Sequence, residues 1–299
     1  MTTPRLHPEG TSMPTFDTTG PILATLDLVV ADTRVSATDT PGTVVEIRPT
    51  DPSSDRDVRA AEETHVEYAD GELRVKTPKL RNLGLFGKTG SIDVVISLPT
   101  GSRLHAGVSV GAFHCTGTLG ETRVKSATGD LRLEHTGTLT ASTSGGAIVV
   151  QSVDGDAHAS TASGSVHLGH VRGSAVVRNS NGDSHISSAG GDVRVSAANG
   201  SIVIGYAGGD VTASTANGSV RVEEVTRGTV SVKTAAGELA VGVAEGTAAY
   251  LDLHTSFGKV RNQLDEGGAP APGEQRVEVR ARTSFGNIDI VRAARREAA

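Results

Sequence analysis

Glycine returns about every nine residues through most of this chain, and this spacing limits what the chain can fold into. After nearly every glycine come a small or acidic residue and then two apolar residues separated by one other, as in Gly200-Ser201-Ile202-Val203-Ile204. Internal repetition at a fixed period is typical of repeat architectures, which need no active site. The series, with one short and one long step, is Gly120, Gly129, Gly137, Gly146, Gly155, Gly164, Gly173, Gly182, Gly191, Gly200, Gly209, Gly218, Gly228, Gly237 and Gly246.

Each nine-residue unit has room for one strand of four or five residues and a tight turn, so two units predict a coil of about 18 residues. Alternation within the strand points two apolar side chains inward and the residue between them outward. We therefore predict an all-β fold, a single-stranded parallel β-solenoid (β-helix) with two strands per coil. The predicted inward pairs are Leu131/Leu133, Ile148/Val150, Val166/Leu168, Ile202/Ile204, Val220/Val222 and Leu239/Val241, and on the opposite side Ala157/Ala159, Ala175/Val177, Val193/Val195, Val211/Ala213 and Val230/Val232.

The repeat divides the chain into five segments. Residues 1–20, rich in Pro, Thr and Ser, are expected to be a disordered leader. Residues 21–110 are expected to form an N-terminal β-strand region and cap, residues 111–261 the regular solenoid, and residues 293–299 a tail. Residues 262–292 contain an insert with Pro270 and Pro272, followed by a last strand pair that we expect to close the solenoid.

In the N-terminal region the nine-residue period fades, but β character persists. Strands are predicted over Ile22–Val30, Thr43–Arg48, His65–Thr77 and Ile92–Leu98, and a loop or one short helix over Asp51–Thr64. The closing strands are predicted over Arg276–Arg282 and Asn287–Val291. Such irregular coils and caps shield the terminal strand edges of a solenoid from further pairing.

Composition excludes several classes of protein. Apolar residues make up 36% of the chain and aromatic residues 3%, with no Trp, which suits a thin aliphatic interior. The net charge of −6 argues against nucleic-acid binding, which normally needs a basic face. The single cysteine, Cys115, falls at an inward position and is expected to be a buried thiol. No stretch reaches the 18 or more apolar residues of a membrane span, and no signal peptide is recognised, so we expect a cytoplasmic location, with peripheral membrane contact allowed.

The repeated units from Ala127 to Val241, the lead-in Asp27–Val30, the stretch Val44–Pro52 and the closing Arg280–Gly286 together resemble a known family. It is the bacterial domain-of-unknown-function family labelled "putative adhesin", with toastrack-like β-strand repeats, and the likeness is to its actinobacterial type. The resemblance covers roughly residues 20 to 292. It implies a β-solenoid associated with cell-envelope stress systems, and it carries over no catalytic residue.

Three sets of repeated side chains are candidates for structural or binding roles. Asn181, Asn199 and Asn217 each precede a glycine of one register, Gly182, Gly200 and Gly218, and predict a stacked turn ladder. His167 and His185 occupy the same outward position one coil apart, so we expect a stacked surface pair and no metal site. Phe257 and Phe285 lie in two copies of Thr-Ser-Phe-Gly and are expected to plug the C-terminal end.

One non-repetitive segment has the composition of a docking site. The loop between residues 76 and 90 combines cations with large apolar side chains in an acidic protein, and it suits either an end plug or docking to a protein partner or an anionic membrane. Its residues are Lys76, Lys79, Leu80, Arg81, Leu83, Leu85, Phe86 and Lys88.

From these observations we expect a non-enzymatic scaffold or interaction protein with no cofactor, no metal and no catalytic residue. Its partner is expected to be a protein in a cell-envelope-associated or regulatory complex. The alternative is an adhesin-like surface-binding rod, and a more remote one is a carbohydrate-active β-helix enzyme, which would need a groove lined with carboxylates and aromatic residues.

Overall fold

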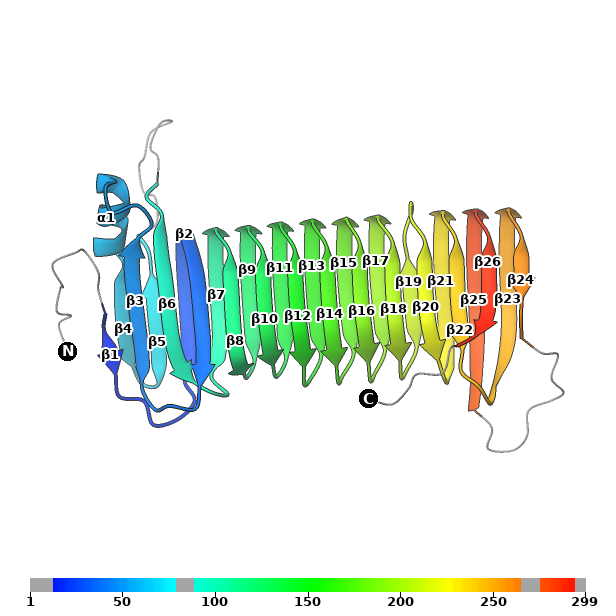
Figure 1. Cartoon of the computed structure of the whole chain (residues 1–299), viewed down its shortest axis with the longest axis horizontal. Helices are drawn as coiled ribbons and strands as arrows, with labels where there is room; N and C mark the ends of the chain where they lie inside the picture. The colour runs from blue at the N-terminus through cyan, green and yellow to red at the C-terminus, as the bar shows by residue number, and fades with distance from the viewer. Residues whose placement is uncertain (1–12, 79–88, 265–274, 294–299) are drawn as a thin grey trace. The chain divides into compact units, whose positions relative to one another are not determined.

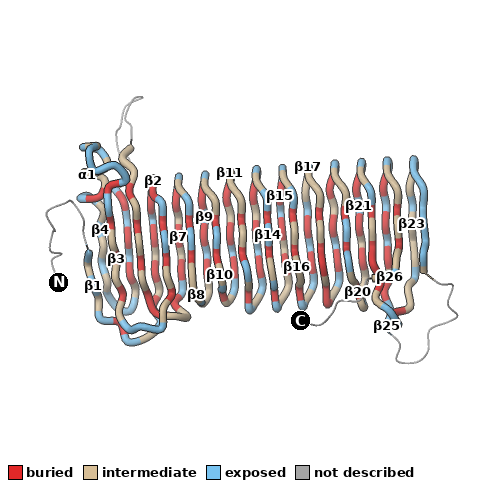
Figure 2. The backbone as a smooth tube through the Cα atoms, in the orientation of Figure 1, coloured by how far each residue is buried: buried red, intermediate tan, exposed pale blue. Residues whose placement is uncertain are grey.

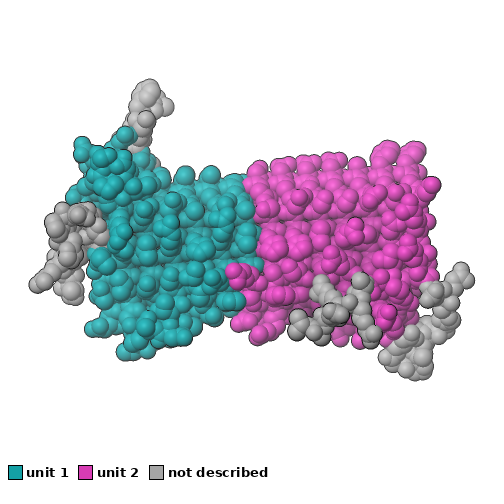
Figure 3. Space-filling model, viewed as in Figure 1, with its two compact units in different colours: residues 1–150 teal, residues 151–299 magenta. Residues whose placement is uncertain are grey.

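The computed structural model describes residues 13–78, 89–264 and 275–293, and within them the chain is a β-solenoid with one helix (Figure 1). The chain divides into two compact units, Met1–Val150 and Gln151–Ala299 (Figure 3). The boundary lies within strand β12 (Ile148–Val153), inside the segment 111–261 that the repeat predicts as one run. Each unit is built from two sheets, which we call sheet A and sheet B.

In unit 2 every strand pairs in parallel with strands of the neighbouring coils, as the 18-residue period predicts. Ala175 of β15, for example, pairs with Val193 of β17. The order in sheet B is β13 (Ala157–Ser163), β15 (Ala175–Asn181), β17 (Val193–Asn199), β19 (Val211–Ser214), β21 (Gly228–Ala236), β25 (Gln275–Phe285) and β23 (Thr247–Phe257). The order in sheet A is β14 (Val166–Val171), β16 (Ser184–Ala189), β18 (Ile202–Ala207), β20 (Val220–Val225), β22 (Leu239–Val243), β26 (Ile288–Arg292) and β24 (Val260–Asn262).

The interior is lined by short aliphatic side chains, which confirms the predicted inward pairs. Leu131 is 0% exposed and Ile202 is 1% exposed, and the other members of those pairs are likewise buried. The residues between them point outward, so buried and exposed positions alternate along each strand (Figure 2). Cys115 is also buried, and desolvation raises the pKa of its thiol well above the usual range.

Glycine is needed for different physical reasons in the two registers of the repeat. In one register the glycine adopts positive φ, as at Gly200 with φ of 131°, a conformation that a Cβ disfavours. In the other register, Gly191 has no positive φ, but an added Cβ would lie 2.7 Å from Ser174 Oγ of the preceding coil. At Gly191 glycine is therefore required because neighbouring coils approach closely, whereas the last two glycines of this register, Gly228 and Gly246, again have positive φ.

A buried polar column runs beside the positive-φ glycines and was not predicted. Thr215, Thr234 and Thr283 donate side-chain hydrogen bonds to glycine carbonyls of the corner, and Asn179 donates to Gly164 O at 3.0 Å and Gly182 O at 2.8 Å. These four side chains are buried, and each donates a hydrogen bond to a backbone carbonyl of the corner. The corner is thus held from inside as well as by its glycine.

Unit 1 departs from the pure parallel arrangement at its N-terminal end. The long strand β2 (Leu23–Thr38) belongs to both sheets, pairing with β5 and β7 through its first half and with β6 and β8 through its second half. Sheet B contains β4 (His65–Ala69), β5 (Glu72–Lys76), β2, β7 (Arg103–Val110), β9 (Thr122–Thr128) and β11 (Leu139–Gly145). Sheet A contains β1 (Thr15–Phe16), β3 (Thr43–Pro49), β6 (Ile92–Pro99), β2, β8 (Phe113–Leu119) and β10 (Leu131–Thr136).

Several sequence predictions for this end need correction. The expected leader 1–20 is ordered at least in part, because β1 pairs with β3 and Thr18 is buried against Thr43. The predicted strand His65–Thr77 is a hairpin, β4 and β5, with its turn at Asp70 and Gly71, which both have positive φ. Asp51–Thr64 contains the short helix α1 (Asp55–Glu62), one of the two structures expected there.

The N-terminal end of unit 1 is closed by antiparallel strands and an aromatic contact. β1 and β3 pair antiparallel in sheet A, as do β3 with β6, and β4 and β5 pair antiparallel in sheet B. Phe16 of β1 and Tyr68 of β4 meet across the interior with ring centroids 5.4 Å apart. The edge strands here are short, two residues in β1 and five in β4.

The C-terminal end of unit 2 differs from the expected order. The closing strands β25 and β26 do not form the last coil, because β25 lies between β21 and β23, and β26 lies between β22 and β24. The last coil is formed by β23 and β24, which come earlier in the chain (Figure 1). A nine-residue period cannot reveal this inversion, because strands of either coil have the same inward pattern.

Candidate interaction surface

The outward face of sheet B in the last coils of unit 2 carries a dense group of polar and aromatic side chains. The inversion places β25 between β21 and β23, so outward residues of three strands align in rows across the sheet. One row joins Ser231, Arg280 and Asp252, and the next joins Lys233, Arg282 and His254. A third row joins Thr229, Glu278 and Tyr250, and Tyr250 is 68% exposed.

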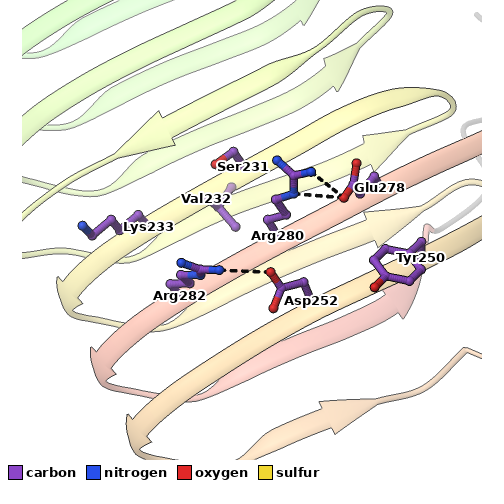
Figure 4. Close-up of a pocket in the computed structure, with 8 residues that line it drawn as sticks. All are labelled: Ser231, Val232, Lys233, Tyr250, Asp252, Glu278, Arg280 and Arg282. Atoms are coloured by element: carbon purple, nitrogen blue, oxygen red, sulfur yellow. Dashed lines mark hydrogen bonds and ion pairs between the residues drawn. The ribbon is translucent and has the colours of Figure 1, made fainter.

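These side chains line an open depression of about 570 Å³, which we call the sheet-B groove (Figure 4). Arg280 donates two hydrogen bonds to Glu278 Oε1, at 2.9 Å from Nε and 2.7 Å from Nη2. Arg282 Nη2 reaches Asp252 Oδ2 at 3.1 Å on the neighbouring strand. The residues lining the groove are Ser231, Val232, Lys233, Tyr250, Asp252, Glu278, Arg280 and Arg282.

The groove is more cationic than the protein as a whole. It has three cations, Lys233, Arg280 and Arg282, against two carboxylates, in a chain with net charge −6. Both arginines already have acidic partners, whereas Lys233 forms no ion pair with any residue that the structure describes. In the two preceding coils the column of Lys233 holds the uncharged Ser214 and Ser196, and Arg178 occupies it one coil before them.

The groove contains two carboxylates and an exposed aromatic ring. Asp252 and Glu278 each accept hydrogen bonds from a guanidinium. No cluster of three metal-ligating side chains occurs among the described residues. The groove thus presents ion pairs, the Lys233 ammonium and a tyrosine ring to solvent.

A second depression, of about 310 Å³, lies on unit 2 around His170 and Ser188. His170 Nδ1 and Ser188 Oγ are 2.8 Å apart, the spacing of a nucleophile and its base. The nearby Asp154 pairs with Arg172 at 3.3 Å, and no described carboxylate is hydrogen-bonded to the imidazole. Because the orienting third group of a triad is missing there, we interpret the contact as one step of an outward ladder.

The asparagines of the predicted ladder lie one above another. Asn199 Nδ2 donates to Asn181 Oδ1, and Asn217 Nδ2 donates to Asn199 Oδ1, both at 2.9 Å. The same column continues through Ala236 to Phe285 and Phe257. These phenylalanines stack with centroids 5.0 Å apart, and they are 59% and 68% exposed, so the expected end plug is wrong: they lie on the outside, at a corner.

The histidine pair also lies as the period predicts. His167 and His185 are opposite each other on β14 and β16, with parallel rings whose centroids are 4.7 Å apart. Partial burial, with the adjacent His185 as a second cause, lowers the pKa of the His167 imidazole. His185 Nε2 contacts Ser187 Oγ at 3.2 Å, and no third ligand converges on the pair among the described residues.

The aspartates that follow the glycines form hydrogen bonds to the next coil. Asp183 Oδ1 accepts from the backbone N–H of Ser201 at 2.8 Å, and Asp192 Oδ1 accepts from that of Asp210 at 2.9 Å. In each case donor and acceptor are 18 residues apart. These carboxylates therefore join one coil to the next.

Of the predicted docking loop, only Lys76 lies within the described residues, exposed at the end of β5. Lys79, Leu80, Arg81, Leu83, Leu85, Phe86 and Lys88 lie outside them. The sequence prediction missed the sheet-B groove altogether. Its signal is the outward alternation Glu278, Arg280, Arg282 beside Tyr250, Asp252, His254, but only the strand order brings the two sets together.

The fold and its surfaces place the protein among parallel β-solenoid repeat proteins. The sequence pattern described as Toastrack DUF4097 matches residues 31–291, and the chain belongs to that family. The curated proteins include no match.

Two solved structures match this chain over nearly its whole length at low sequence identity. A "putative adhesin" from Bacteroides fragilis is 12% identical, with 94% of this chain and 96% of that chain covered and a TM-score of 0.40. A "putative lipid binding protein" from Parabacteroides distasonis is also 12% identical over 94% and 96% of the two chains, with a TM-score of 0.43. Among the described residues, no helix has the length and apolar character needed to cross a lipid bilayer.

Proposed function

We propose that this protein is a non-catalytic interaction protein that binds a protein partner through the sheet-B groove. The observation that carries the proposal is the cluster of an exposed tyrosine and three cations in one depression on an otherwise acidic chain. Tyrosine and arginine are the residue types enriched where protein interfaces concentrate their binding energy. The sheet presents the cations at low entropic cost, because the strands β21 and β25 that carry them are paired on both sides.

The charges indicate the chemistry of the partner. Arg280 and Arg282 are held in place by Glu278 and Asp252, whereas Lys233 is available for a new acceptor. A partner segment with a carboxylate near an apolar or aromatic side chain would meet Lys233 and Tyr250 together. Electrostatic attraction of this kind favours fast association and falls as salt is added.

The cellular setting is part of the proposal and rests on family resemblance. We propose a cytoplasmic, envelope-associated or regulatory complex, with anionic membrane contact as a secondary feature of the segment after Lys76. Cell fractionation tests this setting. Recovery of the protein outside the membrane would favour the adhesin-like alternative and overturn the cytoplasmic location.

Site-specific photo-crosslinking in cells tests the groove. A photoreactive residue in place of Tyr250 is expected to give a discrete crosslinked species, and the same residue in place of Arg221, outward on sheet A, is expected to give none. The Lys233→Glu and Arg280→Glu substitutions should abolish the product at unchanged protein level. Equal products from both positions, or a product insensitive to the charge reversals, would contradict the proposal.

A further inference from the structure

The last coil of unit 2 leaves its interior open. In β23 the inward side chains Ala249, Leu251 and Leu253 are half-exposed, whereas their partners on β25 are at most 2% exposed. In β24, Val260 is 45% exposed, and its partner Ile288 is 0% exposed. The apolar seam of the solenoid therefore continues to this end and faces solvent there.

The strand edges at this end are also unpaired. Among the described strands, β23 pairs only with β25, and β24 pairs only with β26. β23 is eleven residues long, with no proline and no charged residue among its inward positions. Natural proteins usually protect an edge strand by shortness, charge, proline or a covering element. Within the described residues β23 is long and has no proline and no covering strand, and its one carboxylate, Asp252, points outward and is paired with Arg282.

Exposed apolar residues gather at the same place. Six large hydrophobic residues are exposed among those described, and Tyr250, Phe257, Val260 and Phe285 all belong to β23, β24 and β25. Phe257 and Phe285 stack on each other at one corner, and Tyr250 lies near the other end of β23. Exposed apolar residues are therefore spread along the strands of this end, as an interaction surface would require.

We propose that this end, which we call the open end, binds the open end of a second copy of the same chain. The end presents two strand edges, one in each sheet, on either side of an apolar seam. β23 is the longer of the two edges, eleven residues against three in β24. A second copy offers the same edge, and a two-fold axis along the sheet normal pairs β23 with β23, antiparallel.

The sequence of β23 is compatible with pairing to itself. Its straight part, Thr247–Thr255, is centred on Leu251, so the register in which every residue of this part is paired places Leu251 opposite Leu251. Tyr250 then faces Asp252, and Ala249 faces Leu253. No two like charges are opposed in β23, and the inward residues of the two copies form one continuous apolar row.

The charged groups near the seam already have partners within one chain. Asp252 accepts from Arg282, and Arg261 of β24 lies 3.6 Å from Asp289. The groove and the proposed edge share Tyr250 and Asp252 of β23, whereas Lys233 and Arg280 lie on strands that do not form the edge. The sheet-B groove would continue across the two-fold axis into the groove of the second copy.

Sedimentation analysis of the full chain over a wide range of concentrations tests this proposal. We expect a reversible dimer whose dissociation constant rises by at least about tenfold in Leu251→Lys, because a lysine on an edge strand opposes pairing. The matched control Val110→Lys, at an exposed valine of unit 1, should leave the dimer unchanged. A monomer at every concentration, or a dimer that tolerates Leu251→Lys, would overturn the proposal.

A crosslinking measurement keeps the test valid if Leu251→Lys fails to fold. In Leu251→Cys, a short bismaleimide should join two copies, whereas Arg221→Cys should remain monomeric. The native Cys115 does not interfere, because it is 1% exposed. Absence of a crosslinked dimer from folded Leu251→Cys, checked by circular dichroism, would also overturn the proposal. If the chain forms no dimer but still crosslinks to a partner through position 250, the dimer proposal fails while the proposed partner binding stands.

Discussion

The apolar interior and its strand edges end differently in the two terminal regions of the described chain. At the N-terminal end of unit 1, the edge strands are short and antiparallel, and Phe16 and Tyr68 contact each other across the interior. At the C-terminal end of unit 2, the last strand is long and parallel to its neighbour, and the aromatic pair Phe257 and Phe285 lies outside the interior. An aromatic pair therefore spans the interior at one end and lies outside it at the other. The position of an aromatic residue relative to the apolar seam, and not its type, decides whether it can cover the seam.

The largest expected effect is a difference in stability between alanine substitutions of two leucines, one near each end. Leu73 of β5 is 0% exposed beneath the edge strand β4, whereas Leu251 of the edge strand β23 is half-exposed. We expect Leu73→Ala to lower the free energy of unfolding by about 2–5 kcal/mol, because a buried cavity results. Leu251→Ala should cost less than about 1 kcal/mol under monomeric conditions. Urea unfolding of both variants measures the difference, and equal losses would show that Leu251 is packed as tightly as Leu73.

The next effect concerns two tyrosines. Tyr68 packs against Phe16, while Tyr250 is 68% exposed. Tyr68→Ala should lower the free energy of unfolding by about 1–2 kcal/mol, since both burial and the aromatic contact are lost. Tyr250→Ala should change it by less than about 0.5 kcal/mol. Hydrogen exchange of the β3 and β4 amides provides a local measure, and unchanged protection in Tyr68→Ala would contradict a capping role.

A smaller effect is expected in the column that changes from asparagine to phenylalanine. Asn199 takes part in two amide hydrogen bonds of 2.9 Å, to Asn181 and Asn217. Asn199→Ala should lower the free energy of unfolding of unit 2 by about 1 kcal/mol, because both bonds are exposed to competing water. Ala236→Asn is the matched control, since it extends the ladder at the position where it ends, and it should not destabilise the unit. Thermal unfolding of both variants checks this order.

The smallest effect is a pH dependence in the middle of unit 2. The pKa of His167 is lowered in the folded state by burial and by His185, so the folded protein binds this proton less tightly than the unfolded chain. Stability from this group is therefore present above the ordinary pKa of 6.5 and is lost as the pH falls through that value toward the folded pKa. NMR titration should show the lowered pKa of His167, and His185→Gln should move it upward. A His167 pKa unaffected by His185→Gln would remove the neighbouring imidazole as a cause.

Much of the fold could be predicted because the repeat period and the strand alternation are local properties. The inward positions of Leu131, Ile202 and Val220 follow from apolar alternation after a glycine, and the stacking of His167 on His185 follows from an 18-residue offset. The hairpin turn at Asp70-Gly71 also has a local signal, which the long apolar pattern of His65–Thr77 obscured.

The sheet-B groove and the open end could not be predicted in the same way. Both depend on β25 lying between β21 and β23, which brings Arg282 beside Asp252 although 30 residues separate them. Every coil has a similar inward pattern, so alternation does not specify which coil follows which. The order is decided by how complete strands and their corners pair in three dimensions.

The amino-acid sequence by itself determined the parallel solenoid, the length of its coil and the side chains that line its seam, because glycine spacing and apolar alternation act over a few residues. Only the tertiary structure decided which strands are last, and therefore which aromatic side chains cover the seam and which face solvent. That choice depends on pairing between strands far apart in the chain, as Phe285 beside Ala236 on one side and Phe257 on the other demonstrates.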